Sequence, residues 1–314
     1  MEVNFTLANA CSLTDNCINL TNCTMELNLD LANASPVVTV NYSKIELWLV
    51  GCGGTGSWLA PSLVRLGRVL SQQGKQVKLY FVDPDRVESA NVLRQCFCDA
   101  EIGFNKAKTL ALRYSLAWKM EVTAIAQPFQ PEWIVPSYNT LIVVTACVDN
   151  AKARESISQV LQHNTHRAAP HIWHLDCGNS KRNGQVLLGS HLSTNPNDYD
   201  FEALGCFRLP APTIQQPDLL VSQPEELADN NLSCEQMALL NSQSLSINQR
   251  VAAEAFDYLL QLTAGKLRRF ATYFDLESGS GKSLYTTQVS IMQAKGYISQ
   301  LAVEKAPVFK MDIV

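Results

Sequence analysis

The chain has 314 residues, of which 46% are hydrophobic and 17% charged, and its net charge is −4. These proportions are typical of a water-soluble protein with one large α/β domain or two modest ones. The acidic balance gives no basic surface for nucleic acid, and no apolar run approaches the ~20 residues of a membrane-spanning helix. We therefore expect a protein that binds neither nucleic acid nor membranes. Because no basic, apolar leader begins the sequence, we also expect it to be cytoplasmic.

The ten cysteines include no Cys-x-x-Cys pair. Structural zinc sites usually draw their ligands from such pairs, so we expect no structural zinc. A chain of this size does not need disulfides to fold. Reduced thiols are the simplest interpretation.

The N-terminal residues contain a short repeat. Residues 1–12 and 25–36 read MEVNFTLANACS and MELNLDLANASP, with seven identical positions. Both copies alternate apolar and polar residues, a pattern that favours a half-buried strand. We therefore expect a duplicated, strand-like segment over residues 1–36, followed by the main domain over residues 37–314.

From residue 45 the pattern becomes an alternation of strands and helices. The expected strands cover residues 45–50, 77–82, 122–126, 141–145, 172–175 and 186–189. The expected helices cover residues 57–70, 107–118 and 151–162. This order is typical of an α/β fold with a Rossmann-like, doubly wound and mostly parallel sheet.

The C-terminal part departs from this alternation. Residues 191–232 contain five prolines and no clear periodicity, so we expect a long loop. A helix is expected over 234–262, and the runs 270–276 and 283–291 flank a turn, which predicts a hairpin. The sheet is therefore expected to be extended by C-terminal antiparallel strands. The GSGK turn between these runs lacks the first glycine of a phosphate-binding Walker loop and no helix is expected after it.

A glycine-rich loop follows the first strand of the alternating region. Gly51, Gly53 and Gly56 fit G-x-G-x-x-G, in which glycines allow backbone N–H groups to approach phosphate oxygens at a helix N-terminus. The next strand ends at Asp83, and a carboxylate there can accept hydrogen bonds from ribose hydroxyls. This pair of features suits NAD and ATP equally.

The residues after Asp83 favour ATP. Arg94 and Lys106 place a guanidinium and an ammonium beyond the ribose-binding strand. Such donors serve an attack on an α-phosphate, where charge develops on phosphate oxygens and on departing pyrophosphate. Asp149 follows the strand 141–145 and is well placed to hold Mg²⁺, which needs only one or two protein carboxylates.

These residues resemble a known family. The motifs G-x-G-G-x-G, D-x-D-x-V, N-x-x-R-Q, I-G-x-x-K and D-N occur in that order over roughly residues 45–155. They resemble the ThiF/MoeB/HesA proteins and ubiquitin-activating enzymes. The stretches LDCGNSKRNGQVLLG and LSCEQMALLNSQSLSINQ resemble, more weakly, the ThiF-family branch of plasmid PRTRC systems.

The resemblance implies a reaction and a set of roles. The C-terminal glycine carboxylate of a small ubiquitin-like or sulfur-carrier protein would attack the α-phosphate of ATP, giving an acyl-adenylate and pyrophosphate. Arg94 and Lys106 would stabilise the transition state, Asp149 would coordinate Mg²⁺, and the enzyme would be a homodimer. The implied nucleotide-binding residues are Gly51, Gly53, Gly54, Gly56, Asp83, Asp85, Asn91, Arg94, Gln95, Lys106, Asp149 and Asn150.

The sequence departs from the family pattern in two ways. Family members often supply a further arginine from the partner subunit's N-terminal segment, but this chain has no arginine before Arg65. The paired zinc cysteines of many members are also missing. Because of the first departure, another group would have to supply the positive charge that this arginine places beside the α-phosphate in those family members.

Some relatives pass the activated glycine to an enzyme thiol. Cys234 is the first candidate, because Ser233 can cap the helix expected there and a helix N-terminus lowers a thiol pKa. Cys177 and Cys206 are alternatives, and all three cysteines could equally be small buried side chains. Cys52 and Cys147 are interpreted as packing residues near the nucleotide.

Other functions stay open at this point. The glycine loop and Asp83 alone would also suit a nicotinamide-dependent oxidoreductase. The missing N-terminal arginine suits a non-catalytic module that keeps the fold and docks a ubiquitin-like partner. Activation of a tRNA-linked carboxylate is a further possibility, although no basic groove for tRNA is evident.

Overall fold

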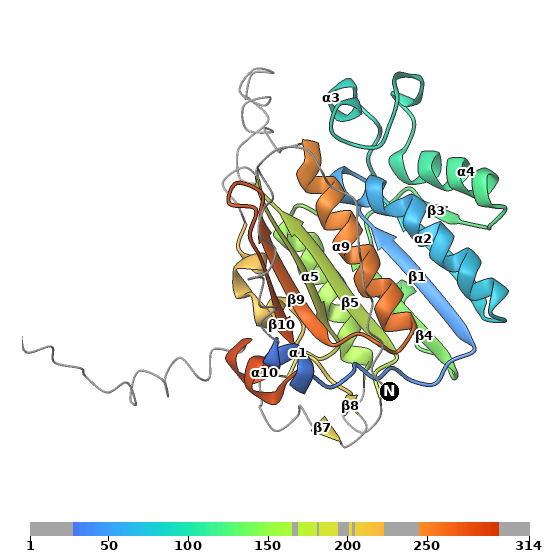
Figure 1. The fold of residues 1–314 in the computed structure, drawn as a ribbon. Helices are drawn as coiled ribbons and strands as arrows, with labels where there is room; N and C mark the ends of the chain where they lie inside the picture. The colour runs from blue at the N-terminus through green and yellow to red at the C-terminus, as the bar shows by residue number, and fades with distance from the viewer. Residues whose placement is uncertain are drawn as a thin grey trace, which may run out of the picture.

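The computed structural model describes residues 28–164, 169–180, 182–193, 201–202, 205–222 and 245–294. Their centre is an eight-stranded sheet with helices on both faces (Figure 1). The strands are β1 (Lys44–Val50), β2 (Gln76–Val82), β3 (Thr123–Ile125), β4 (Thr140–Ala146), β5 (Ile172–Asn179), β6 (Asn183–Gly189), β9 (Arg269–Asp275) and β10 (Gly281–Tyr285). The short strands β7 (Phe201–Glu202) and β8 (Gly205–Cys206) pair only with each other.

The strand order is β10-β9-β6-β5-β4-β1-β2-β3. The five strands from β5 to β3 run parallel, and β6, β9 and β10 extend the sheet by antiparallel pairing. The expected doubly wound, mostly parallel sheet with antiparallel C-terminal strands is therefore confirmed. The chain leaves β1 toward β2 and later returns to its other side at β4, so the carboxyl ends of β1 and β4 border a topological switch point.

Two sets of helices cover the sheet. One face carries α2 (Gly54–Gln72), α4 (Lys106–Trp118) and α9 (Leu245–Thr263), and the other carries α5 (Ala151–Ser158), η4 (Gln159–His163), α6 (Pro212–Gln215) and η6 (Pro217–Leu220). Shorter elements are α1 (Leu29–Asn33), α3 (Ser89–Val92), η2 (Asp99–Glu101), η3 (Pro131–Trp133) and α10 (Gln288–Ala294). None of the helices in these described ranges is long and apolar enough to cross a membrane.

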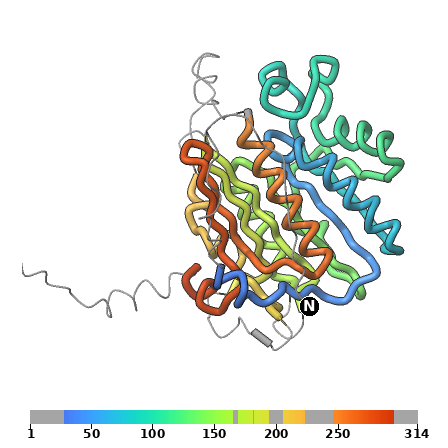
Figure 2. The backbone as a smooth tube through the Cα atoms, in the orientation of Figure 1, coloured from blue at the N-terminus to red at the C-terminus, as the bar shows by residue number. Residues whose placement is uncertain are grey.

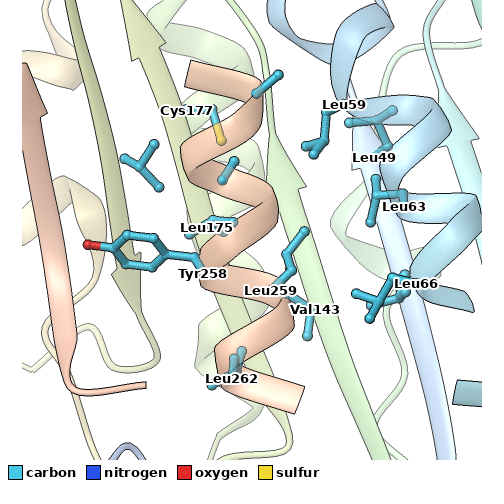
Figure 3. Close-up of a cluster of buried hydrophobic side chains, with 14 of the residues drawn as sticks. Leu49, Leu59, Leu63, Leu66, Val143, Leu175, Cys177, Tyr258, Leu259 and Leu262 are labelled. Atoms are coloured by element: carbon cyan, nitrogen blue, oxygen red, sulfur yellow. The ribbon is translucent and has the colours of Figure 1, made fainter. Parts of the chain in front are cut away.

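The strand pattern divides the core into two layers. In β1, Leu47 and Leu49 join the layer under α2 and α9, whereas Trp48 and Val50 join the layer under α5. This alternation is the period of two expected for a strand buried on both faces. In Figure 3, Leu259 lies on the side of α9 that faces Leu63 and Leu66 of α2. The fold therefore packs α9, which comes late in the chain, directly beside α2 at the glycine loop.

The second copy of the N-terminal repeat is not a strand. Its described residues form α1, because the Asn28 side chain accepts the N–H of Leu31 and caps the helix. Leu29 and Leu31 are exposed, so the apolar alternation does not bury one face. The strand expected over residues 25–36 is therefore wrong for residues 28–36, and the first copy lies outside the described residues. Figure 2 shows α1 beside α10, where the Ser35 N–H donates to the Thr286 carbonyl at 3.0 Å.

The C-terminal expectations need two corrections. The second hairpin strand, expected to run to residue 291, ends at Tyr285, and α10 follows because the Thr287 hydroxyl accepts the N–H of Ser290. The long loop expected over 191–232 contains β7, β8, α6 and η6 in its described parts. There the Val38 N–H donates to the Cys206 carbonyl at 2.8 Å, so the segment is fixed against the chain after α1. The helix expected over 234–262 is described from Leu245 onward as α9.

Candidate functional site

The glycine loop occupies the switch point between β1 and α2. Gly51 has a φ of +89°, and a Cβ there would lie 2.5 Å from the Cys147 carbonyl oxygen. A Cβ at Gly56 would lie 1.9 Å from the Gly51 carbonyl oxygen. Both positions exclude any side chain, so the loop closes tightly and α2 begins directly behind it. Its first N–H groups thereby form a helix N-terminus suited to phosphate.

Asp83 holds the glycine loop against β2. One carboxylate oxygen accepts the Cys52 N–H at 2.6 Å and the other accepts the Asp85 N–H at 2.8 Å. The side chain is buried, and this burial raises the pKa of the carboxyl group. A carboxylate has about four acceptor sites, so the two backbone bonds are compatible with a further hydroxyl donor. The ribose contact of Asp83 stays a prediction, and its bracing of the loop is an additional role.

Lys106 reaches the same edge of the sheet from α4. Its ammonium lies 3.3 Å from the exposed carboxylate of Asp85, while most of its side chain is buried. Asn105 caps α4 and also donates its amide to the backbone carbonyls of Asp83 and Asp85. The amide therefore fixes the helix start, and with it Lys106, to the end of β2.

The segment around α3 contributes Asn91, Arg94 and Gln95. The buried Asn91 amide oxygen accepts the Glu88 N–H in a capping box, so at least part of its side chain serves the turn. The Arg94 carbonyl accepts the indole N–H of Trp58 at 3.3 Å, which ties the segment to α2.

Gln95 is the member of this segment nearest the glycine loop. Its amide nitrogen would lie 3.7 Å from a Cβ at Gly53. Its amide oxygen is buried without a hydrogen-bond partner. Amide oxygen and nitrogen exchange places by a flip, so this amide can present either group. An orphaned polar group beside a helix N-terminus is suited to a polar ligand such as a phosphate.

Asp149 lies at the carboxyl end of β4. Its side chain is exposed, and one carboxylate oxygen accepts the Asn150 amide at 3.3 Å. The Asn150 oxygen is occupied by the N–H of Ala153, where it caps α5. The described residues hold no group of three or more metal-ligating side chains. A single carboxylate is nevertheless enough for Mg²⁺, which takes its other ligands from phosphates and water.

Three polar residues that the sequence analysis did not single out meet above the loop. The Asn248 side-chain oxygen accepts the Thr55 hydroxyl at 3.3 Å and the Asn179 amide at 2.7 Å. The same oxygen would lie 2.7 Å from a Cβ at Gly54. Asn248 is buried in α9 and joins α2 and β5 at the site. Its only signal in the sequence was a polar residue at a position on the apolar face of the helix.

A cavity of about 520 Å³ adjoins this edge. It is lined by residues from α2, α3 and the chain after it, α4 and α9, among them Trp58, Gln95, Arg113 and Gln249. Because Gln95 borders both the cavity and the glycine loop, a molecule in the cavity would lie next to that loop.

The structure tests two of the three candidate thiols. Cys177 is buried in β5 with its side chain in the core, and contact with Cys147 together with burial raises its pKa well above the ordinary value. Burial raises the pKa of Cys206 to about 12. Neither thiol ionises near neutral pH in this environment, so both are packing residues here. Cys234 lies outside the described residues.

Comparisons with known proteins agree with this architecture. The model of the ThiF family matches residues 27–216, which is more than half of the chain. The match is to the family as a whole and does not assign a branch. None of the curated proteins matches the sequence significantly.

Solved structures give more distant similarities. The crystal structure of selenomethionine PaaA is 16% identical with a TM-score of 0.48, covering 78% of this chain and 65% of that chain. Escherichia coli MccB with ATP is 14% identical with a TM-score of 0.47, and MccB with MccA-N7isoASN is 15% identical with a TM-score of 0.49. Each covers 82% of this chain, and this chain spans 65% of the length of each.

Proposed function

The chain belongs to the ThiF family, and we propose that it uses ATP to adenylate the C-terminal glycine carboxylate of a small ubiquitin-like or sulfur-carrier protein. The convergence of groups at one edge of the sheet carries this proposal. The glycine loop, Asp83, Lys106 and Asp149 come from the ends of β1, β2 and β4 and the start of α4. Ligands of open α/β sheets bind in the crevice at this edge.

The groups at this edge of the sheet fit a nucleoside triphosphate. The glycines have no side chains that would cover the backbone N–H groups at the N-terminus of α2, and the Gln95 amide, whose oxygen has no hydrogen-bond partner, lies beside them. Asp83 and Asp85 lie at the end of β2, where ribose hydroxyls are bound in such folds. Lys106 supplies a positive charge that the adjacent Asp85 holds in place. These contacts support ATP as the cofactor.

The proposed chemistry is a single displacement at phosphorus. A carboxylate oxygen of the carrier's terminal glycine forms a bond to the α-phosphorus, and the bond from that phosphorus to the bridging oxygen breaks. The electron pair leaves with pyrophosphate. Arg94 and Lys106 would donate hydrogen bonds to the oxygens on which negative charge grows. Asp149 would hold Mg²⁺, which when bound neutralises charge on the phosphates.

The test combines this protein with ATP, magnesium and a small carrier protein ending in glycine. We expect carrier-dependent exchange of labelled pyrophosphate into ATP and a carrier whose intact mass increases by one adenylate. A spectral change with NADH and no pyrophosphate release would instead support an oxidoreductase. Tight carrier binding without exchange would identify a non-catalytic module.

The fate of the adenylate is a separate question. If Cys234 accepts the activated glycine, then Cys234→Ser will keep pyrophosphate exchange and lose a thiol-sensitive enzyme–carrier adduct. Retention of the adduct in that variant would exclude Cys234. Loss of exchange as well would mean that the substitution affects the adenylation site itself.

A further inference from the structure

Strand β5 sends two ionisable side chains into the layer of the core under α5. Trp173 and Leu175 point into the opposite layer, toward α2 and α9, so His174 and Asp176 face α5. Asp176 is 1% exposed and His174 is fully buried. A buried carboxylate is costly unless it is paired, so the partner of Asp176 is the informative contact.

That partner is Arg154 of α5. Its guanidinium Nε lies 3.3 Å from a carboxylate oxygen of Asp176, and its side chain is 12% exposed. A second guanidinium nitrogen, Nη2, donates to the Val148 carbonyl at 2.8 Å. Val148 immediately precedes Asp149. One guanidinium therefore joins the end of β5 to the loop that carries the candidate magnesium ligand.

The remaining anchors of this loop lie on either side of Asp149. The Cys147 N–H donates to the Val50 carbonyl at 2.7 Å, and the Asn150 side chain caps α5. Between these two points the Val148 peptide is oriented by Arg154. A planar guanidinium can serve two acceptors at fixed angles, whereas a lysine ammonium is a compact point charge on a flexible stem.

We propose that Arg154 and Asp176 are positioning residues that orient the Val148 peptide so that the Asp149 carboxylate faces the nucleotide crevice. Asp176 acts through Arg154, and Arg154 acts through the backbone of the loop. The nearby His174 ring lies 4.0 Å from a carboxylate oxygen of Asp176 and is buried with it. This inference rests on the proposed function, because it assigns Asp149 to the metal that accompanies ATP.

The test separates positioning from stability. Arg154→Lys keeps the charge but loses the planar group that serves Asp176 and the Val148 carbonyl together, and Asp176→Asn removes the carboxylate charge. For both variants we expect the Mg²⁺ concentration that half-maximally tightens ATP binding to rise at least tenfold in calorimetry. Both will also lower the melting temperature, because Arg154→Lys loses a buried hydrogen bond and Asp176→Asn leaves the buried guanidinium without its counter-charge. The double variant Arg154→Met with Asp176→Leu replaces the pair by apolar groups, a change that often restores stability. It should recover the melting temperature while its Mg²⁺ requirement stays raised.

A matched control is Arg269→Lys, since Arg269 of β9 pairs with Glu254 and Asp257 of α9 away from this loop. It should lower the melting temperature and keep the wild-type Mg²⁺ requirement. The proposal is overturned if the Arg154 and Asp176 single variants keep the wild-type Mg²⁺ requirement. If a single variant does not fold, the same result in the double variant overturns it. If the wild-type protein shows no Mg²⁺-dependent ATP binding, the proposed function fails first.

Discussion

Asp149 is the residue at which function and stability are most easily separated. Its side chain is exposed, so Asp149→Ala should change the free energy of unfolding by no more than about 0.5 kcal/mol. The same change removes the proposed magnesium ligand and should abolish ATP–pyrophosphate exchange. Urea unfolding and exchange assays on the variant check both statements. The control is Asp218→Ala, which changes an exposed aspartate of η6 and should keep pyrophosphate exchange. Near-normal exchange by Asp149→Ala would mean that the metal ligand is another residue.

Arg94 bears on the missing N-terminal arginine. With no arginine before Arg65, Arg94 and Lys106 are the in-chain candidates for charge at the α-phosphate. Arg94→Lys keeps the charge but loses the two parallel hydrogen bonds of a guanidinium. Loss of one preorganised donor costs ~3 kcal/mol, so turnover should fall on the order of a hundredfold while ATP affinity falls less. Pyrophosphate exchange at saturating ATP measures this, and rates within about a factor of two would mean that Arg94 is structural.

At the scale of elements, the β1–α2 connection depends on backbone closeness. In Gly56→Ala the new Cβ would meet a backbone carbonyl at 1.9 Å, so α2 must move away from β1. We expect a loss of at least about 2 kcal/mol in stability and weakened ATP binding. Gly67 lies in the same helix, but its Cβ would meet only side-chain tips, those of Leu79 at 3.1 Å and Val77 at 3.4 Å. Gly67→Ala should therefore stay within about 1 kcal/mol and bind ATP normally, because alanine also favours the helix. Urea unfolding and calorimetry compare the two variants, and equal effects would contradict the role given to Gly56.

Most elements of the parallel sheet could be predicted because their strands are buried on both faces and read as continuous apolar runs. The glycine loop and Asp83 followed from the same pattern, since they come where such strands end. The repeat at residues 25–36 misled because a capped helical turn with exposed leucines has the same short alternation as a strand.

Contacts between distant segments could not be predicted from the local sequence pattern. Asn248 reaches Thr55 only because α9 packs beside α2, and the burial of Cys177 and Cys206 depends on which face each strand presents. The Arg154–Asp176 pair likewise needs α5 to lie across β5. Such facts come from tertiary packing rather than from periodicity.

At the scale of the whole molecule, stability should fall in mild acid because of His174. Burial and the nearby charge of Arg154 lower its pKa to about 3, whereas an unfolded histidine titrates near 6.5. The stabilising contribution of the neutral ring is complete above pH 6.5 and is lost as the pH falls toward 3, because only the unfolded chain takes up the proton.

Between pH 6.5 and 5 this amounts to about 1.6 kcal/mol, because half of the unfolded rings are already protonated at pH 6.5 and the slope reaches about 1.4 kcal/mol for each pH unit only below that. Urea unfolding of the wild-type protein and of His174→Leu at both pH values measures it, and the difference between the two proteins isolates this residue from other titrating groups. The wild-type protein should lose more stability than the variant by that amount. Parallel losses in the two proteins would show that His174 is protonated in the folded state.

We also predict a homodimer. The resemblance to dimeric relatives implies it, and Leu93, Ile102 and Phe104 are exposed large apolar side chains on the segment from α3 to α4. Light scattering at micromolar concentration should give twice the chain mass, and Leu93→Glu with Phe104→Glu should shift the protein toward monomer. A wild-type monomer under these conditions would refute the prediction.

The bond between Thr55 and Asn248 spans 193 positions of the chain. On a ribosome that adds roughly 5–20 residues each second, about 10–40 s separate the emergence of the glycine loop from that of the asparagine that closes over it. A nascent chain can thus assemble the parallel strands of its first half before α9 exists. The proposed phosphate-binding end of α2 is completed only by the last third of the polypeptide, so a nascent chain without α9 presents the glycine loop without its Asn248 contact.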